Sequence, residues 1–134
     1  MAVKIIDIEL SAKVINGQLV AHLCLVNNST SNMYLDEHTI CYNNRVRGDF
    51  FKIQNENCED VDYTGIKVCR DIKPENFIPL APAEKVETDI SLSDVYELEK
   101  GRKYVIQYST YHPSYLEEDE LTKFKSNVIE IVYE

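Results

Sequence analysis

Tryptophan is absent from this 134-residue chain, and glycine and proline occur only four times each. Collagen-like and Pro/Gly-rich disordered classes are thereby excluded. Basic residues are the minority charge, with 14 Lys and Arg against 23 Asp and Glu, giving a formal net charge of −9. Because phosphate backbones are bound by clustered Lys and Arg, we expect no nucleic-acid partner. Hydrophobic residues make up 44%, which predicts a single globular domain over residues 1–134.

Long apolar runs are also lacking. No segment approaches the roughly 18 apolar residues that span a bilayer, so we expect no membrane contact. Residues Met1–Leu10 interleave acids with apolar side chains, unlike a signal peptide, and this favours a cytoplasmic protein. No CxxC pair occurs, so we expect reduced thiols and no zinc site. The four cysteines are Cys24, Cys41, Cys58 and Cys69.

Alternation of apolar and polar residues with a period of two dominates the chain and predicts strands. It is clearest at Lys85–Leu92, where Val86, Thr88 and Ile90 alternate with charged residues. The other expected strands and short apolar stretches are Val3–Leu10, Gln18–Val26, Met33–Leu35, Thr39–Tyr42, Asp49–Gln54, Ile66–Arg70, Lys103–Thr110 and Asn127–Tyr133. This spacing predicts an all-β, immunoglobulin-like antiparallel two-sheet sandwich of seven to nine strands.

Turn residues separate these segments. Asn16-Gly17 predicts a turn between the first two strands, which form either a hairpin or a passage between sheets. Three of the four prolines lie between Lys73 and Glu84, so that segment is not a central strand. Asp36–His38 is interpreted as a solvated turn, because adjacent residues of an extended chain point to opposite faces. The one helix candidate is the short, acidic segment Ser114–Phe124.

Tyr104 follows the Gly101 turn at the start of a predicted strand. In immunoglobulin-like sandwiches a tyrosine at this place bonds the upstream backbone through its hydroxyl, forming a structural corner. Ile106 stands two residues later, where antibody domains carry a cysteine, so aliphatic packing replaces the disulfide between the sheets. We therefore assign Tyr104 a structural role.

A resemblance to a known family covers about 60% of the chain, from Asn27 to Tyr108. The matching segments are Val26–Ser29, Asp49–Ile53, Val61–Arg70, Glu75–Glu84, Thr88–Leu98 and Gly101–Tyr108. Their order resembles the non-catalytic β-sandwich domain that precedes the protease domain in deuterolysin (aspzincin) zinc metallopeptidases. This chain departs from the family at Pro82-Ala83-Glu84, where a glycine usually precedes the glutamate.

The resemblance implies a free-standing relative of an accessory domain that covers or assists its enzyme. The catalytic domain of the family carries a His-Glu-x-x-His helix, and no such motif occurs in this sequence. Small intracellular proteinase inhibitors of bacteria are similar in fold class and size, which is a looser likeness. We therefore expect a binding protein with no enzymatic activity and no cofactor.

The candidate partner-binding residues follow the Tyr104 strand, in a segment expected to be a loop. Tyrosines are frequent there, and tyrosine supplies large contact area at low entropic cost. Four consecutive acids come next, which are either a solvated run or a surface that steers an electropositive partner. The candidate residues are Tyr111, His112, Tyr115, Glu117, Glu118, Asp119 and Glu120.

Other chemistry has little local support. His22 lies on an otherwise apolar strand and is interpreted as a histidine satisfied by a neighbouring group. No nucleotide-binding glycine loop and no Gly-x-Ser-x-Gly elbow occurs. We therefore expect no metal site, although acidic loops keep a weak calcium site open.

Three function classes follow. The first is a protein-binding module that inhibits, or confers immunity against, a partner such as a protease or toxin. The second is an assembly subunit that forms a homodimer by pairing an edge strand, Val3–Leu10 or Asn127–Tyr133, with its copy. The third is an enzyme with an unrecognised site, which the absence of catalytic motifs disfavours.

Overall fold

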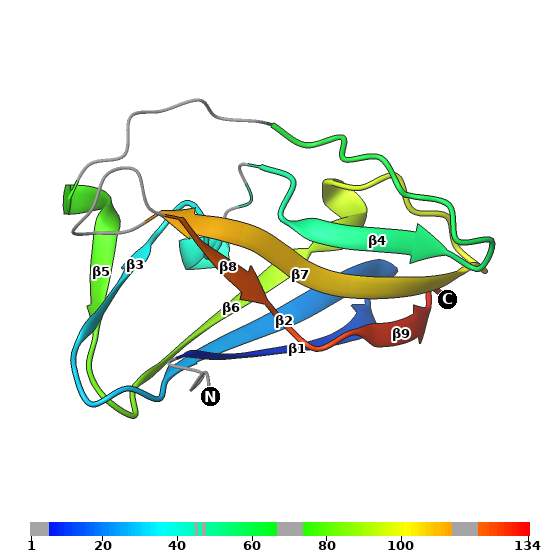
Figure 1. Cartoon of the computed structure of the whole chain (residues 1–134). Helices are drawn as coiled ribbons and strands as arrows, with labels where there is room; N and C mark the ends of the chain where they lie inside the picture. The colour runs from blue at the N-terminus through cyan, green and yellow to red at the C-terminus, as the bar shows by residue number, and fades with distance from the viewer. Residues whose placement is uncertain (1–5, 45, 47, 67–73, 114–120) are drawn as a thin grey trace.

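The computed structural model describes residues 6–44, 46, 48–66, 74–113 and 121–134. These residues form nine strands and three short 3₁₀ turns (Figure 1). The strands are β1 (Ile6–Ile15), β2 (Gln18–Asn27), β3 (Met33–Asp36), β4 (Phe51–Asn55), β5 (Phe77–Leu80), β6 (Lys85–Ser91), β7 (Lys103–Pro113), β8 (Leu121–Lys125) and β9 (Ile129–Val132). The 3₁₀ turns are η1 (Tyr42–Asn44), η2 (Pro74–Asn76) and η3 (Leu92–Asp94). The predicted all-β sandwich is confirmed.

Every strand pair between these elements is antiparallel. One sheet has the order β1-β2-β6, and β7 is the centre of the other, with β4 on one side and β8 and β9 on the other. A third, two-stranded unit, β3-β5, lies at the end of the molecule away from the C-terminus (Figure 1). The two-sheet prediction therefore omitted this small additional sheet.

The Asn16-Gly17 turn joins β1 and β2 as a hairpin, which settles the choice left open by the sequence. Asn16 has φ 50° and Gly17 has φ 78°. Two consecutive positive φ angles match the twist of a two-residue hairpin, and asparagine and glycine tolerate them best. Strand β2 is central in its sheet, because it pairs with both β1 and β6.

The core lies between the two main sheets. Alternate residues of β2, from Leu19 to Leu25, are fully buried and face the alternate residues of β7 that carry aromatic and aliphatic side chains. Tyr104, Ile106 and Tyr108 are all buried, which agrees with the period of two expected for Lys103–Thr110. Burial of each large side chain contributes about 1.5–3 kcal/mol relative to exposure.

Two sequence interpretations near β3 were wrong. Thr39–Tyr42 is not a strand: it forms turns that lead into η1, where Asn43 and Asn44 adopt φ 58° and 61°. The Asp36–His38 turn is not solvated throughout, since Asp36 is 1% exposed and its carboxylate accepts a hydrogen bond from the Thr39 hydroxyl at 2.5 Å. Local polarity could not reveal that β7 lies against this turn, where His112 bonds the Asp36 N–H and the Tyr108 hydroxyl bonds the Thr39 carbonyl.

The helix expected over Ser114–Phe124 is wrong where the structure describes it, because Leu121–Lys125 is strand β8. The segment Ser114–Glu120 lies outside the described residues, as does most of the expected strand Ile66–Arg70. Pro79 does lie in a strand, β5, but among the described strands β5 pairs only with β3, as the proline rule requires.

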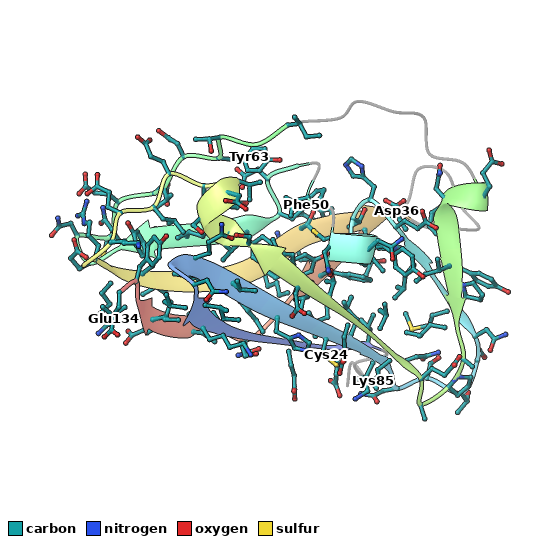
Figure 2. All side chains as sticks on the ribbon, turned by 180° about the vertical axis from the view of Figure 1, so that it is seen from behind. Cys24, Asp36, Phe50, Tyr63, Lys85 and Glu134 are labelled. Atoms are coloured by element: carbon teal, nitrogen blue, oxygen red, sulfur yellow. The ribbon has the colours of Figure 1, made fainter. Side chains whose placement is uncertain are left out.

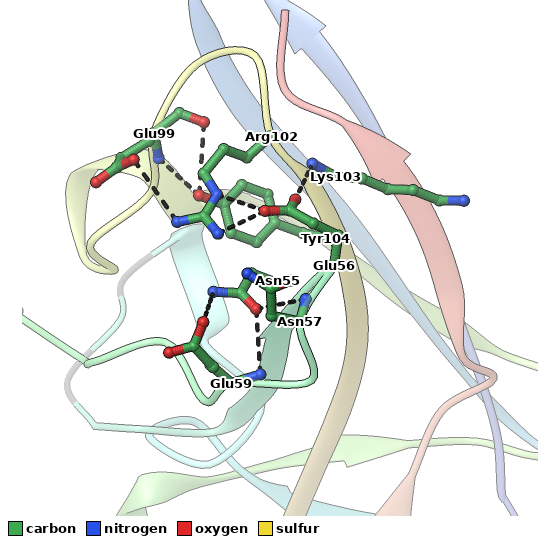
Figure 3. Close-up of polar contacts among 8 residues, drawn as sticks. All are labelled: Asn55, Glu56, Asn57, Glu59, Glu99, Arg102, Lys103 and Tyr104. Carbon is green, nitrogen blue, oxygen red and sulfur yellow. Dashed lines mark hydrogen bonds and ion pairs between the residues drawn. The ribbon is translucent and has the colours of Figure 1, made fainter.

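Tyr104 has the geometry expected of a tyrosine corner (Figure 3). Its hydroxyl accepts a hydrogen bond from the Glu99 backbone N–H at 2.7 Å, and its ring is 2% exposed. Beside it, the Arg102 guanidinium holds the Glu56 carboxylate, with 2.7 Å from Nε to Oε1. The Lys103 N–H donates to the other Glu56 oxygen at 3.0 Å. The turn after β4 is thus tied to the start of β7.

The Tyr104 corner gives a first testable expectation. Tyr104→Phe keeps the ring but leaves the Glu99 N–H without its acceptor, so we expect a loss of about 1–2 kcal/mol in unfolding free energy. Urea unfolding followed by circular dichroism measures it. The control is Val105→Ala on the opposite side of the same strand. An unchanged unfolding midpoint for Tyr104→Phe would contradict the corner assignment.

Two buried tyrosines predict how stability changes at high pH. Burial raises the pKa of Tyr108, and burial together with the Asp49 hydrogen bond raises the pKa of Tyr96. Both side chains are therefore neutral in the folded protein. Their contribution to the free energy of unfolding is complete below about pH 10, the pKa of an unfolded tyrosine, and it is lost as the pH rises above that value. We expect the melting temperature to fall above that pH.

Absorbance at 295 nm provides the matching readout, because it reports phenolate formation. At least two of the nine tyrosines should ionise together with unfolding rather than before it. A smooth titration of all nine while the circular dichroism stays native would contradict this expectation.

No helix among the described residues is long and apolar enough to cross a membrane.

Candidate protein-binding face

The structure separates the two described members of the predicted binding segment. The segment is not a loop up to Pro113, because β7 continues to that residue and pairs with β8. Tyr111 is 59% exposed, whereas His112 is 5% exposed. Successive residues of a strand point to opposite faces, which is why neighbours differ so sharply. Tyr115, Glu117, Glu118, Asp119 and Glu120 lie outside the described residues.

His112 is an interior residue, so its assignment as a surface contact is wrong. Its Nε2 accepts a hydrogen bond from the Asp36 backbone N–H at 2.8 Å, which requires that nitrogen to be unprotonated. Its ring stacks on Phe124 with centroids 4.5 Å apart and meets the edge of Phe77 at 6.0 Å. His112 therefore joins β3, β5, β7 and β8 at one end of the sandwich.

Tyr111 points outward from β7, away from the core between the two main sheets. The Lys123 ammonium lies 4.4 Å from the centre of the Tyr111 ring, within the range of a cation–π contact. Lys123 is directly opposite Tyr111 across the β7/β8 pair, and Lys125 is opposite Ser109. The exposed Tyr111 ring thus lies beside the lysine side chains that β8 directs to the same side of the sheet.

The same face continues toward β4. Lys52 is opposite Gln107 across the β4/β7 pair, and the Gln107 amide donates to the Ser126 carbonyl at 2.8 Å. We define the Tyr111 face by the outward side chains around this centre. Its members are Lys52, Gln107, Ser109, Tyr111, Lys123 and Lys125.

Charge is distributed unequally over the two sheets. Outward side chains of the second sheet include four lysines, the fourth being Lys103, which pairs with the one outward glutamate, Glu130, at 3.2 Å. Outward side chains of β1 and β6 instead include four acids and two lysines, and we call this the acidic face. Its charged members are Asp7, Glu9, Lys13, Lys85, Glu87 and Asp89. Among the outward side chains of the described strands, lysines therefore outnumber acids on the second sheet, and acids outnumber lysines on β1 and β6.

His22 and Cys24 lie on the acidic face. Figure 2 shows Cys24 and Lys85 on the opposite side of the molecule from Phe50 and Tyr63. His22 Nδ1 is 2.7 Å from an Asp89 carboxylate oxygen, so its partner is a carboxylate on the neighbouring strand. Partial burial and the nearby Glu87 raise the pKa of the Cys24 thiol. A raised pKa lowers the thiolate fraction, which disfavours nucleophilic chemistry at this cysteine.

Within the described ranges, no group of three or more His, Cys, Asp or Glu side chains is arranged to hold a metal ion. Cys24, Cys41 and Cys58 are free thiols. Cys41 is buried, and burial raises the pKa of its thiol to about 12. The raised pKa values disfavour Cys24 and Cys41 as reactive centres, and the Tyr111 face remains the strongest candidate site.

Sequence reasoning identified Tyr111 but missed the lysines around it. The signal was available, because Lys103, Gln107, Ser109 and Tyr111 alternate with the buried Tyr104, Ile106 and Tyr108. The hairpin register that brings Lys123 and Lys125 beside this row depends on residues between β7 and β8 that carry no strand pattern. The interpretation of that region as loop and helix hid the pairing.

Comparison with known proteins gives one informative similarity. No family model matches the chain. The chain is 28% identical, over 106 residues, to a probable neutral protease 2 homolog B from Trichophyton rubrum. The aligned part is 76% of this chain, and the chain spans 28% of the length of that protein. The chain is therefore similar to a minor part of a protein named as a protease.

Proposed function

We propose that this chain is a non-catalytic β-sandwich domain that binds a protease, and that the Tyr111 face makes the contact. The observation that carries the proposal is the exposed Tyr111 ring with Lys123 over it, on the outer side of the second sheet. The protease context comes from the similarity to part of a probable neutral protease 2 homolog.

The finer assignment is a relative of the non-catalytic sandwich domain of deuterolysin-type metallopeptidases. Support for it comes from the sequence segments described above and from the all-β fold. The 134 residues contain no His-Glu-x-x-His motif, which supports a binding role over a catalytic one. Free thiols at the described cysteines agree with a reducing compartment, as cytoplasmic localisation would require.

The chemistry of the face defines the partner. Tyrosine supplies rigid contact area that is apolar over its ring and polar at its tip, and such residues concentrate binding energy in interfaces. The surrounding lysines attract carboxylates, while Gln107 and Ser109 offer neutral hydrogen-bonding groups. The partner surface that fits is acidic, with a pocket or apolar patch for one aromatic ring.

Binding at such a face can inhibit the protease or assist its folding, and an activity assay separates the two. An inhibitor lowers turnover of the mature enzyme when added at stoichiometric amount. An assisting domain leaves the mature enzyme unchanged but raises the yield of active enzyme on refolding. The inhibitory or immunity role is the one we propose.

The experiment replaces Tyr111 by a photoreactive phenylalanine analogue in the full chain and irradiates an extract of the source cell. Mass spectrometry should identify a protease as the main cross-linked product, and adding the chain should reduce the activity of that protease. The matched control places the analogue at Ser11, an exposed position on the opposite sheet. Equal recovery from both positions, or a product that is not a protease, would overturn the proposal.

A further inference from the structure

Strand β1 is the edge of its sheet, and β2 is the one described strand with which its ten residues pair. Ile15 and Gln18 flank the two-residue turn, so the odd-numbered residues of β1 bond to β2. The even-numbered residues then direct their N–H and C=O groups to the free side. Among the even-numbered residues of β1, Leu10 is the one whose backbone groups form hydrogen bonds on the free side to a described residue.

The partner of Leu10 is the side chain of Asn127, which lies between β8 and β9. The Leu10 N–H donates to Asn127 Oδ1 at 2.7 Å, and Asn127 Nδ2 donates to the Leu10 carbonyl at 3.0 Å. A primary amide that gives and receives at one residue reproduces the pair of bonds that an added strand would make. Asn127 therefore occupies the middle of the free edge, next to which β9 lies (Figure 1).

Charges on β1 determine what could pair with this edge. In an antiparallel pairing of two copies centred on Leu10, Asp7 of each copy lies opposite Lys13 of the other, and Glu9 lies opposite Ser11. Pairings centred on Ile8 or Glu9 instead place carboxylates opposite each other, which is destabilising. Pairing centred on Leu10 is thus one favourable register of a second copy, and its centre is the residue that Asn127 covers.

We infer that the β1 edge is a strand-pairing site for a second copy of this chain, and that the Asn127 side chain holds it closed. Open edge strands promote association, and natural proteins block them by several devices. Ile8 and Ala12, on either side of Leu10, direct backbone N–H and C=O groups to the free side without a partner among the described residues. These groups supply further hydrogen bonds to an added strand once Asn127 is displaced. This inference is independent of the Tyr111 face, which lies on the other sheet.

The test is sedimentation equilibrium of the full chain and its variants at about 100 µM, a concentration at which weak dimers with Kd near 10 µM are mostly formed. Wild type should sediment as a monomer, and Asn127→Ala should approach twice the monomer mass. The matched control is Val128→Ala, an exposed neighbour that makes no bond to β1 and should stay monomeric. Thermal melting checks folding. If the melting temperature of Asn127→Ala is too low, Asn127→Ser provides a second variant that removes the amide from the β1 edge.

Charge variants test the register. Adding Lys13→Glu to Asn127→Ala should weaken the dimer at least tenfold, because Asp7 then faces a carboxylate, and adding Asp7→Lys as well should restore it. Folded edge variants that remain monomeric would overturn the inference. So would a dimer that is indifferent to Lys13→Glu, because it would not use this strand pairing.

Discussion

Tyr111→Ala is expected to weaken binding of the partner protease about 30-fold, the effect of losing roughly 2 kcal/mol at an interface hot spot. Tyr111 is 59% exposed and contributes little to the core, so the unfolding free energy should change by less than about 0.5 kcal/mol. Surface plasmon resonance with the cross-linked protease measures the affinity. Urea unfolding measures the stability.

Tyr111→Phe is the conservative companion of that variant. The ring and its contact with Lys123 remain, so most of the affinity should be retained. The control on the opposite sheet is Lys13→Ala, which should bind as wild type does. If Tyr111→Ala binds as tightly as wild type, the assignment of this face is wrong.

His112→Ala is expected to produce the opposite pattern, with a loss of about 3 kcal/mol in unfolding free energy. The variant removes a ring packed between Phe77 and Phe124 and leaves the buried Asp36 N–H without its acceptor. Affinity for the partner, measured at a temperature where the variant is folded, should change little. Calorimetric melting and urea unfolding both report the stability.

The matched control is Thr122→Ala, because Thr122 is opposite His112 across the β7/β8 pair and is exposed. Its unfolding free energy should stay within about 0.5 kcal/mol of wild type. A His112→Ala protein with native stability and lost binding would restore the sequence-based assignment of His112 as a contact residue.

Local signals predicted those parts of the fold that depend on neighbours in sequence. Asn16-Gly17 predicted a turn, and the period of two around Tyr104, Ile106 and Tyr108 predicted their common buried face. Tyr104 was assigned to a corner because it follows a glycine turn, and its hydroxyl bonds a residue only five positions upstream. Such features require no knowledge of distant segments.

The environment of His112 could not be predicted in this way. Its hydrogen-bond donor belongs to Asp36, 76 residues away, and its ring neighbours come from β5 and β8. A single sequence contains no local mark of such a junction, so a polar, tyrosine-rich stretch was interpreted as a loop. Asp36 itself was misplaced for the same reason, since its burial depends on strands far away in sequence.

The candidate site was predicted only at its centre. Tyr111 could be identified by residue type, whereas the place of Lys52 and Lys125 on the same face depends on the cross-strand register. The overall charge of −9 even pointed away from a basic surface. Net charge describes the whole chain, and the fold decides how opposite signs are separated between its two faces.

The most direct test of the central claim compares charge reversal on the two faces. The double variant Lys123→Glu/Lys125→Glu should slow association with the protease at least tenfold at low salt, since rim charges act mainly on the association rate. The double variant Glu87→Lys/Asp89→Lys on the acidic face should not slow it. Slower association for the second pair but not for the first would contradict the claim that the Tyr111 face binds the protease.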